Sequence, residues 1–270
     1  YEFISKQNHY LKNEFLNEEK LTKPTYDFLD LNSERLSGIA SFIGLNILLL
    51  FFIITFNYEQ FVELPKATAN QLAEETHERV GVVIGSIVMA IVVIMFYFKG
   101  SFNFDKKAKF LKILAQIWVF LNAILVISAM LKNTEYVYYL GLTYKRLGVY
   151  AFLSLAIIGL IFTFIKVSKQ KTNAYLFNQM FWYVYGTILV CSFINWGGII
   201  TSHNLKREDF AANYHFNSVD FNDKQLLEYY QKTNNKEMYK ILKDKIIARQ
   251  NESFLSKVLY DESISFNESK

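Results

Sequence analysis

The polar residues that could do chemistry fall in three short clusters, each beside a long apolar segment. A histidine and a glutamate can exchange protons with a substrate, and an arginine can bind a carboxylate or a phosphate through two parallel hydrogen bonds. These residue types would suit a transferase that acts on a lipid or a glycan. The candidate residues are His77, Glu78 and Arg79 in the first cluster, Thr143, Tyr144, Lys145 and Arg146 in the second, and Asn195 and Trp196 in the third.

Sequence signatures of known enzymes and metal sites are nevertheless absent. The chain has no glycine-rich phosphate loop and no Gly-x-Ser-x-Gly stretch. His77-Glu78 begins like a zinc-binding His-Glu-x-x-His motif, but Gly81 stands where the second histidine would be. The four histidines are dispersed, and the single cysteine, Cys191, excludes an internal disulfide. We therefore predict no catalytic residue, no metal and no cofactor, and favour a protein that is not an enzyme.

The elements that must position these clusters are five segments without any Asp, Glu, Lys or Arg. A helix of 19 residues is about 28 Å long, close to the thickness of the hydrocarbon core of a bilayer. Only 20% of the residues are charged, against about 25% in a typical soluble protein. The sequence therefore predicts an all-α, polytopic transmembrane helical bundle with five spans: 36–56, 80–98, 113–131, 147–165 and 175–196.

The basic residues in the short loops predict the orientation of these spans. Loops 99–112 and 166–174 hold eight Lys and Arg residues, and loops 57–79 and 132–146 hold five. Because basic loops resist translocation, the first pair is expected in the cytoplasm. Segment 1–35 then starts in the cytoplasm, the bundle covers 36–196, and the tail 197–270 lies outside.

The two ends of the chain have different predicted structures. Apolar residues between Phe3 and Leu16 recur at roughly helical spacing and indicate an amphipathic helix at the membrane surface. The tail has eleven basic and eleven acidic residues, which is typical of a soluble segment. Its patterns predict a helix after Asp220 or Asn222, a second over 236–250 and a third over 253–259.

Small and polar residues inside the spans predict how the helices pack. Gly81-x-x-x-Gly85 and Ala40-x-x-x-Gly44 would allow close approach of neighbouring helices. Asn122 lies in the middle of the third span and should face inward, where an interhelical hydrogen bond is favoured over a transport site.

The three polar clusters are all expected at the outer interface. Arg79 and Arg146 would lie beside helix N-termini, which repel cations. An unfavourable local arrangement suggests a partner, so we expect Arg146 to contact Glu78, Asn195 or a lipid phosphate. The alternative is that these side chains extend into the headgroup region of the membrane without a specific partner.

Four stretches of the chain resemble a bacterial family, the domain of unknown function 4173: 76–80, 96–104, 141–150 and 195–205. The most specific is Gly-Leu-Thr-Tyr-Lys-Arg, residues 141–146. The resemblance implies a polytopic protein of the bacterial inner membrane, with further spans upstream, and implies no activity. Members of that family tend to carry an acidic residue after Asn-Trp, whereas this chain has Gly197-Gly198.

Three functions remain open from the sequence, of which the first is favoured and the other two are alternatives. The first is a non-enzymatic scaffold or partner subunit of an envelope complex, with membrane lipids and another protein as partners. The second is a transport or channel subunit, which would usually need ionisable residues inside the bundle. The third is a membrane transferase at the outer face. A net charge of +4, scattered along the chain, argues against nucleic acid as a partner.

Overall fold

A computed structural model describes residues 12–16, 24, 30–61, 69–254 and 257–266, with side chains except at 59–61 and 69–77. All regular elements in these ranges are helices. The chain divides into two compact units. The membrane unit comprises Tyr1–Tyr136 and Gly148–Ser192, and the tail unit comprises Val137–Leu147 and Phe193–Lys270. The tail unit thus includes the turn between the third and fourth predicted spans as well as the C-terminal segment.

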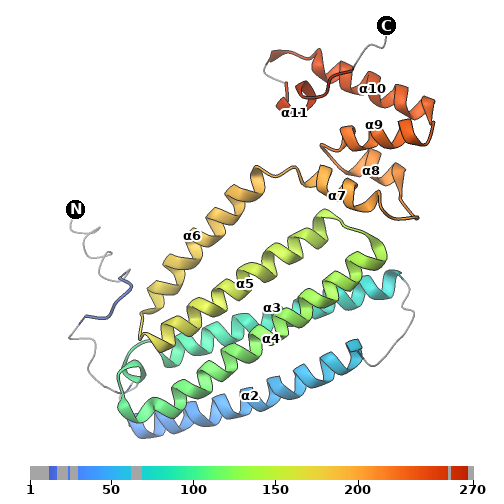
Figure 1. Cartoon of the computed structure of the whole chain (residues 1–270). Coiled ribbons are helices and arrows are strands. Elements are labelled where there is room, and N and C mark those ends of the chain that lie inside the picture. The colour runs from blue at the N-terminus through green and yellow to red at the C-terminus, as the bar shows by residue number, and fades with distance from the viewer. Residues whose placement is uncertain (1–11, 17–23, 25–29, 62–68, 255–256, 267–270) are drawn as a thin grey trace. The chain divides into compact units, whose positions relative to one another are not determined.

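Four helices of the chain are each long and apolar enough to cross a membrane (Figure 1). They are α2 (Leu31–Phe61), α3 (Ala69–Tyr97), α4 (Lys109–Leu140) and α5 (Tyr144–Ser168). The fifth predicted span corresponds to α6 (Asn173–Ser192), which meets the same requirement only when taken together with α7 (Trp196–Asn204) as an interrupted span. The predicted all-α polytopic bundle is confirmed, with four to five spans.

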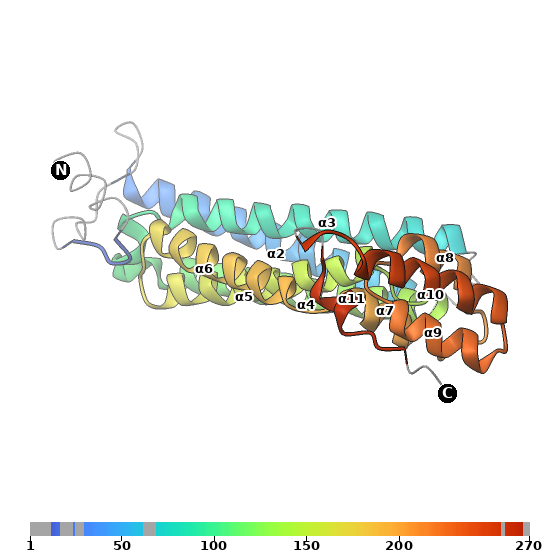
Figure 2. The same cartoon turned by 90° about the horizontal axis from the view of Figure 1, so that it is seen from above.

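Helix α4 is the central helix of the membrane unit. In its most apolar stretch 56% of the residues are buried, against 22–28% in the other three spans. Buried residues on α2 and α3 recur every three or four positions, so each of these helices turns one stripe towards α4. The core includes Phe42 and Ile53 from α2, Val83 and Ile94 from α3, and Trp118 from α4. Figure 2 shows the long helices running alongside one another.

The packing prediction for the glycines is wrong within this chain. Gly81 and Gly85 are exposed, and a Cβ atom added at either would meet no atom within 4 Å; the same holds at Gly44. The close contact lies instead at Gly38, where an added Cβ would be 2.8 Å from the ring of Tyr97. The sequence shows where small residues occur, but in a span that is apolar all round it does not show which face of the helix points inward.

Asn122 is fully buried in α4. Its Oδ1 accepts a hydrogen bond of 2.7 Å from Ser86 Oγ on α3, and its Nδ2 donates to Trp118 O. The side chain therefore links two spans and has both of its polar atoms bonded.

Buried side chains bind the backbone where α3 ends. The loop from Phe98 to Ala108 contains two short 3-10 helices, Ser101–Asn103 and Lys106–Ala108. Asn103 Nδ2 and Lys166 Nζ both donate to Phe98 O, each at 2.7 Å. Carbonyls at a helix C-terminus have no partner within the helix, and these side chains supply one. The predicted fourth span stopped at residue 165, whereas α5 continues through Lys166, which is fully buried.

The tail unit contains five helices in its described part: α7, α8 (Ala212–Ser218), α9 (Asp223–Lys232), α10 (Lys236–Gln250) and α11 (Leu259–Glu262). The helix predicted over 236–250 is observed with those bounds. The prediction of a third helix over 253–259 is wrong, because α11 begins at Leu259, where the predicted helix ends. The core of the unit is formed by Leu226, Leu227, Tyr230, Leu242, Ile246 and Ile264.

Most of the predicted N-terminal amphipathic helix lies outside the described residues. The described part, residues 12–16, is not helical. It packs on the membrane unit: Thr172 Oγ1 donates to Lys12 O at 2.6 Å, and the rings of Phe15 and Phe104 meet edge to face. Residues 31–35, assigned to the N-terminal segment from the sequence, belong to α2.

Candidate functional site

The candidate site lies in the tail unit, at the turn that joins α4 to α5. Gly141 adopts a φ of +80°, a backbone conformation that glycine tolerates and other residues rarely adopt. A Cβ at Gly141 would also lie 2.8 Å from Asn204 Oδ1. Thr143 then acts as the N-cap of α5, since its hydroxyl accepts a hydrogen bond from the backbone of Arg146 at 3.4 Å. The most distinctive stretch of the sequence, residues 141–146, therefore forms a tight turn between two helices and the first residues of α5.

Two arginines bind four successive carbonyls at the end of α4. Arg207 donates to Tyr138 O and, at 2.7 Å, to Tyr139 O. Arg146 donates to Leu140 O at 2.8 Å and also to Gly141 O. A helix C-terminus carries partial negative charge, so two cations stabilise it. The expectation that Arg146 sits unfavourably beside a helix N-terminus is therefore incomplete, because the end of the preceding helix provides acceptors.

Asn204 holds the turn from the side of α7. Its Oδ1 accepts the backbone N–H of Leu142 at 2.7 Å, and its Nδ2 donates to Leu142 O at 2.8 Å. Asn204 is 7% exposed and Leu142 is 6% exposed. This pair of bonds resembles one rung of a β-ladder, and it satisfies a backbone N–H and a carbonyl that the tight turn leaves without helical partners.

The same amide continues into a buried network with His215. Asn204 Nδ2 also lies 3.1 Å from His215 Nε2, and Thr201 Oγ1 lies 2.9 Å from His215 Nδ1. Because Leu142 N–H must donate to Asn204 Oδ1, the Asn204 amide group faces His215 as a donor. His215 Nε2 is then the acceptor, and Nδ1 carries the proton. Asn222 Nδ2 completes the network by donating to Thr201 Oγ1 at 2.9 Å and to His215 O at 2.9 Å.

Burial makes His215 a neutral histidine. It is 2% exposed, and the ring of Phe210 lies against it with the centroids 4.7 Å apart. Loss of hydration lowers the pKa of His215 below its usual value. A neutral imidazole with both nitrogens hydrogen-bonded serves as a structural link between helices α7 and α8.

A small, partly open cavity of about 80 Å³ adjoins this network. Small-molecule sites usually have volumes of about 300–1,000 Å³, so this cavity is suited to a few water molecules rather than to a lipid or a sugar. Its walls come from Leu140–Thr143, Asn204, Arg207, Asp209–Ala211, Tyr214 and His215.

The third predicted cluster caps α7 and brings a later segment close. Asn195 Oδ1 accepts the backbone N–H of Gly198 at 2.9 Å, and its Nδ2 donates to Phe221 O at 2.9 Å. A Cβ at Gly197 would lie 1.7 Å from Asp220 O. Trp196 begins α7 and is partly buried. Glycine after Asn-Trp, a departure from the pattern of the resembling family, is therefore required by this backbone approach.

The first predicted cluster lies in the membrane unit, on α3. Arg79 donates to Phe56 O at 3.2 Å, and its guanidinium lies 4.2 Å from the centre of the Phe56 ring. Glu78 is exposed. His77 belongs to α3, but its side chain lies outside the described residues. Contact of Arg146 with Glu78 stays a prediction.

The remaining residues of the second cluster, Tyr144 and Lys145, are both exposed. Tyr144 donates a long hydrogen bond of 3.4 Å to Asp220 O. Within the part of the chain that has described side chains, no three His, Cys, Asp or Glu residues gather as metal ligands. Sequence reasoning did not identify Asn204, Arg207, His215 and Asn222 as site residues. Asn204 lies in the resembling stretch 195–205 and Asn222 was predicted only as a possible start of a helix, whereas no pattern distinguishes Arg207 and His215.

Comparison with known proteins identifies a family across most of the chain. The family described as "Domain of unknown function (DUF4153)" matches residues 12–226. The chain belongs to this family. The number differs from the 4173 suggested by the motifs, while membership of a family without an assigned function is confirmed. The DUF4153 match includes all the described spans and extends to Leu226 of α9. No curated protein and no solved structure matches the chain.

Proposed function

We propose that this DUF4153 protein is a non-enzymatic membrane scaffold, or a partner subunit, of a complex in the bacterial cell envelope. The observation that carries the proposal is that the distinctive polar residues form hydrogen bonds within the protein and do not line a substrate-sized cavity. Arg146, Arg207 and Asn204 bond to backbone groups of the α4–α5 turn, and the adjoining cavity is too small for a lipid or glycan substrate. Such side chains fix the tail unit internally and leave its surface for binding.

Exposed apolar residues on the tail unit support a protein partner. Phe254 is 87% exposed and Leu259 is 89% exposed. Exposed apolar side chains that gather in a patch outside the membrane spans mark sites of protein interaction. We propose that a second envelope protein covers these two side chains.

Site-specific photo-crosslinking in living cells tests the scaffold. A photoreactive phenylalanine derivative at Phe254 is expected to crosslink to one predominant protein. The same group at Lys240, an exposed position on α10, is the control and should not give that product. If position 254 yields only uncrosslinked protein, or the same faint products as position 240, the scaffold proposal is wrong.

We also propose an orientation in the inner membrane, supported by the distribution of Lys and Arg in the loops. The N-terminal segment lies in the cytoplasm and the tail in the periplasm. In a Cys191→Ser background, cysteine at Ser218 should react with an impermeant thiol reagent in intact spheroplasts, while cysteine at Ser101 should react only after lysis. The reverse labelling would overturn this orientation.

A transport role is the second candidate, and one residue favours it. Lys166 is fully buried in α5, and ionisable residues inside a bundle are typical of ion pathways. Reconstituted protein should then carry an ion or proton flux that Lys166→Met abolishes. If the wild-type protein carries no flux, the transport proposal is wrong, and the role of Lys166 is to cap the end of α3 through its hydrogen bond to Phe98 O.

A further inference from the structure

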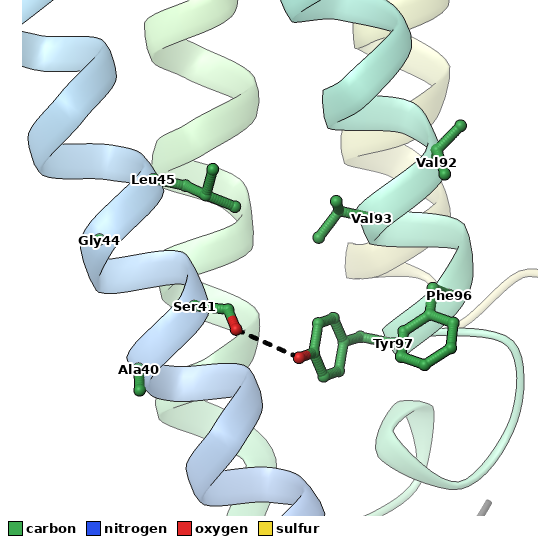
Figure 3. A pocket seen from close by; sticks show the side chains of 8 residues that line it. All are labelled: Ala40, Ser41, Gly44, Leu45, Val92, Val93, Phe96 and Tyr97. Atoms are coloured by element: carbon green, nitrogen blue, oxygen red, sulfur yellow. Dashed lines mark hydrogen bonds between the residues drawn. The ribbon is translucent and has the colours of Figure 1, made fainter.

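An open groove of about 570 Å³ lies between α2 and α3 in the membrane unit (Figure 3). Each helix contributes one face: Ala40, Ser41, Gly44 and Leu45 from α2, and Val92, Val93, Phe96 and Tyr97 from α3. The two helices touch at Gly38 and Tyr97, and they separate towards Gly44, where an added Cβ would meet nothing within 4 Å. The small residues Ala40 and Gly44 thus produce an opening on the surface of two apolar spans.

The lining of the groove is apolar apart from two hydroxyl groups. Ser41 Oγ and Tyr97 OH lie 3.3 Å apart and share one hydrogen bond (Figure 3). Two hydroxyl groups have two hydrogens, and this bond uses one of them. Among the described residues the second hydrogen has no acceptor. An occupant that carries an acceptor oxygen above an apolar chain would therefore fit the groove better than a hydrocarbon chain alone.

A basic segment begins at the same end of the groove. Lys99 lies two residues beyond the end of α3, and its Nζ lies 5.1 Å from the centre of the Phe96 ring, which is part of the groove wall. The segment from Lys99 to Lys112, which includes the first turn of α4, contains five lysines, and Asp105, its only acidic residue, is paired with Arg35 at 3.0 Å. Basic residues next to a span attract anionic lipid headgroups.

We propose that this groove binds one anionic phospholipid. Its acyl chain lies against Gly44, Leu45, Val92 and Val93, an ester oxygen accepts the remaining hydroxyl hydrogen of the Ser41–Tyr97 pair, and its phosphate faces Lys99. Charge complementarity at the lysine end favours an anionic headgroup over a zwitterionic one. The site is independent of the proposed scaffold function.

Native mass spectrometry of the full, detergent-solubilised chain tests the proposal with dioleoylphosphatidylglycerol and dioleoylphosphatidylcholine as the two probes. The wild-type protein is expected to retain one phosphatidylglycerol in preference to phosphatidylcholine. Lys99→Gln should reduce this preference about fivefold, the effect of about 1 kcal/mol for one basic residue at a lipid surface. Lys109→Gln, an exposed lysine outside the groove, is the matched control. Equal losses for the two lysine variants would overturn the site.

Filling the groove tests the place of the acyl chain. Gly44→Leu should abolish retention of phosphatidylglycerol, and Ala40→Leu is the second variant if the first does not fold. Gly85→Leu is the control, because Gly85 is equally exposed on α3 but lies outside the groove. Unchanged retention in a folded groove variant contradicts the proposal. A disulfide between two copies carrying Gly44→Cys, in a Cys191→Ser background, also contradicts it, because a second copy would then fill the groove.

Discussion

Replacing Asn204 by alanine tests whether the α4–α5 turn is held by one side chain. The substitution removes the acceptor of the Leu142 N–H and the donor to Leu142 O, which are bonded at 2.7 and 2.8 Å. A buried backbone group left without a partner costs about 1–3 kcal/mol. Two such groups would cost about 2–6 kcal/mol, and water entering the neighbouring cavity offsets part of this. We expect the free energy required to open the turn to fall by about 3 kcal/mol.

Hydrogen exchange at the turn measures this loss directly. A change of about 3 kcal/mol corresponds to roughly a hundredfold faster exchange of the Leu142 amide. Asn217→Ala is the matched control: Asn217 is exposed on α8 and bonds only within its own helix, to Asn213 O, so its loss should change stability by less than about 0.5 kcal/mol. If the peptide containing Leu142 exchanges at the wild-type rate in Asn204→Ala, then the Asn204 side chain does not hold the turn.

Three further predictions concern the tail unit. Burial lowers the pKa of His215, so below about pH 6.5 the unfolded chain binds a proton that the folded chain does not. The free energy of unfolding should therefore fall as the pH drops below that value. The variant His215→Gln should flatten this dependence. A dependence unchanged in the variant would mean that other groups cause it. Gly197→Ala should destabilise the unit by about 3 kcal/mol or more, because its Cβ would overlap Asp220 O, and an unaltered melting temperature would contradict that contact. Arg146→Lys should cost about 1–2 kcal/mol through weaker bonds to two carbonyls, whereas exposed Lys145→Arg should change the melting temperature little; equal effects would show that the guanidinium is not required.

The long helices could be predicted from the sequence because their signal is local. An uncharged stretch of about 20 residues favours a membrane helix wherever it occurs, and α2, α3, α4 and α5 each contain one. The helix α10 was predicted for a similar reason, from a regular apolar stripe. The nine-residue α7 and seven-residue α8 are too short for such periodicity, and they were missed.

Side-chain orientation required the tertiary structure. The pattern Gly81-x-x-x-Gly85 is the same whether it faces a helix or the lipid, and only the position of α4 decides that these glycines face outward while Gly38 makes the close contact. From the sequence, Lys166 is expected in a loop because its charge ends the uncharged stretch 147–165. Its long side chain reaches Phe98 O, which satisfies the ammonium at a buried helix end.

The sequence by itself determined that this is a polytopic α-helical protein with a distinctive polar stretch at residues 141–146, because hydropathy and residue type are properties of the chain alone. It could not determine what that stretch does. The acceptors of Arg146 are backbone carbonyls, which every residue possesses and no pattern distinguishes. The turn is completed by Asn204, 62 residues beyond Leu142, and by a histidine in α8. Only folding brings these segments together, since hydrogen bonds between distant backbone and side-chain groups are decided by tertiary geometry.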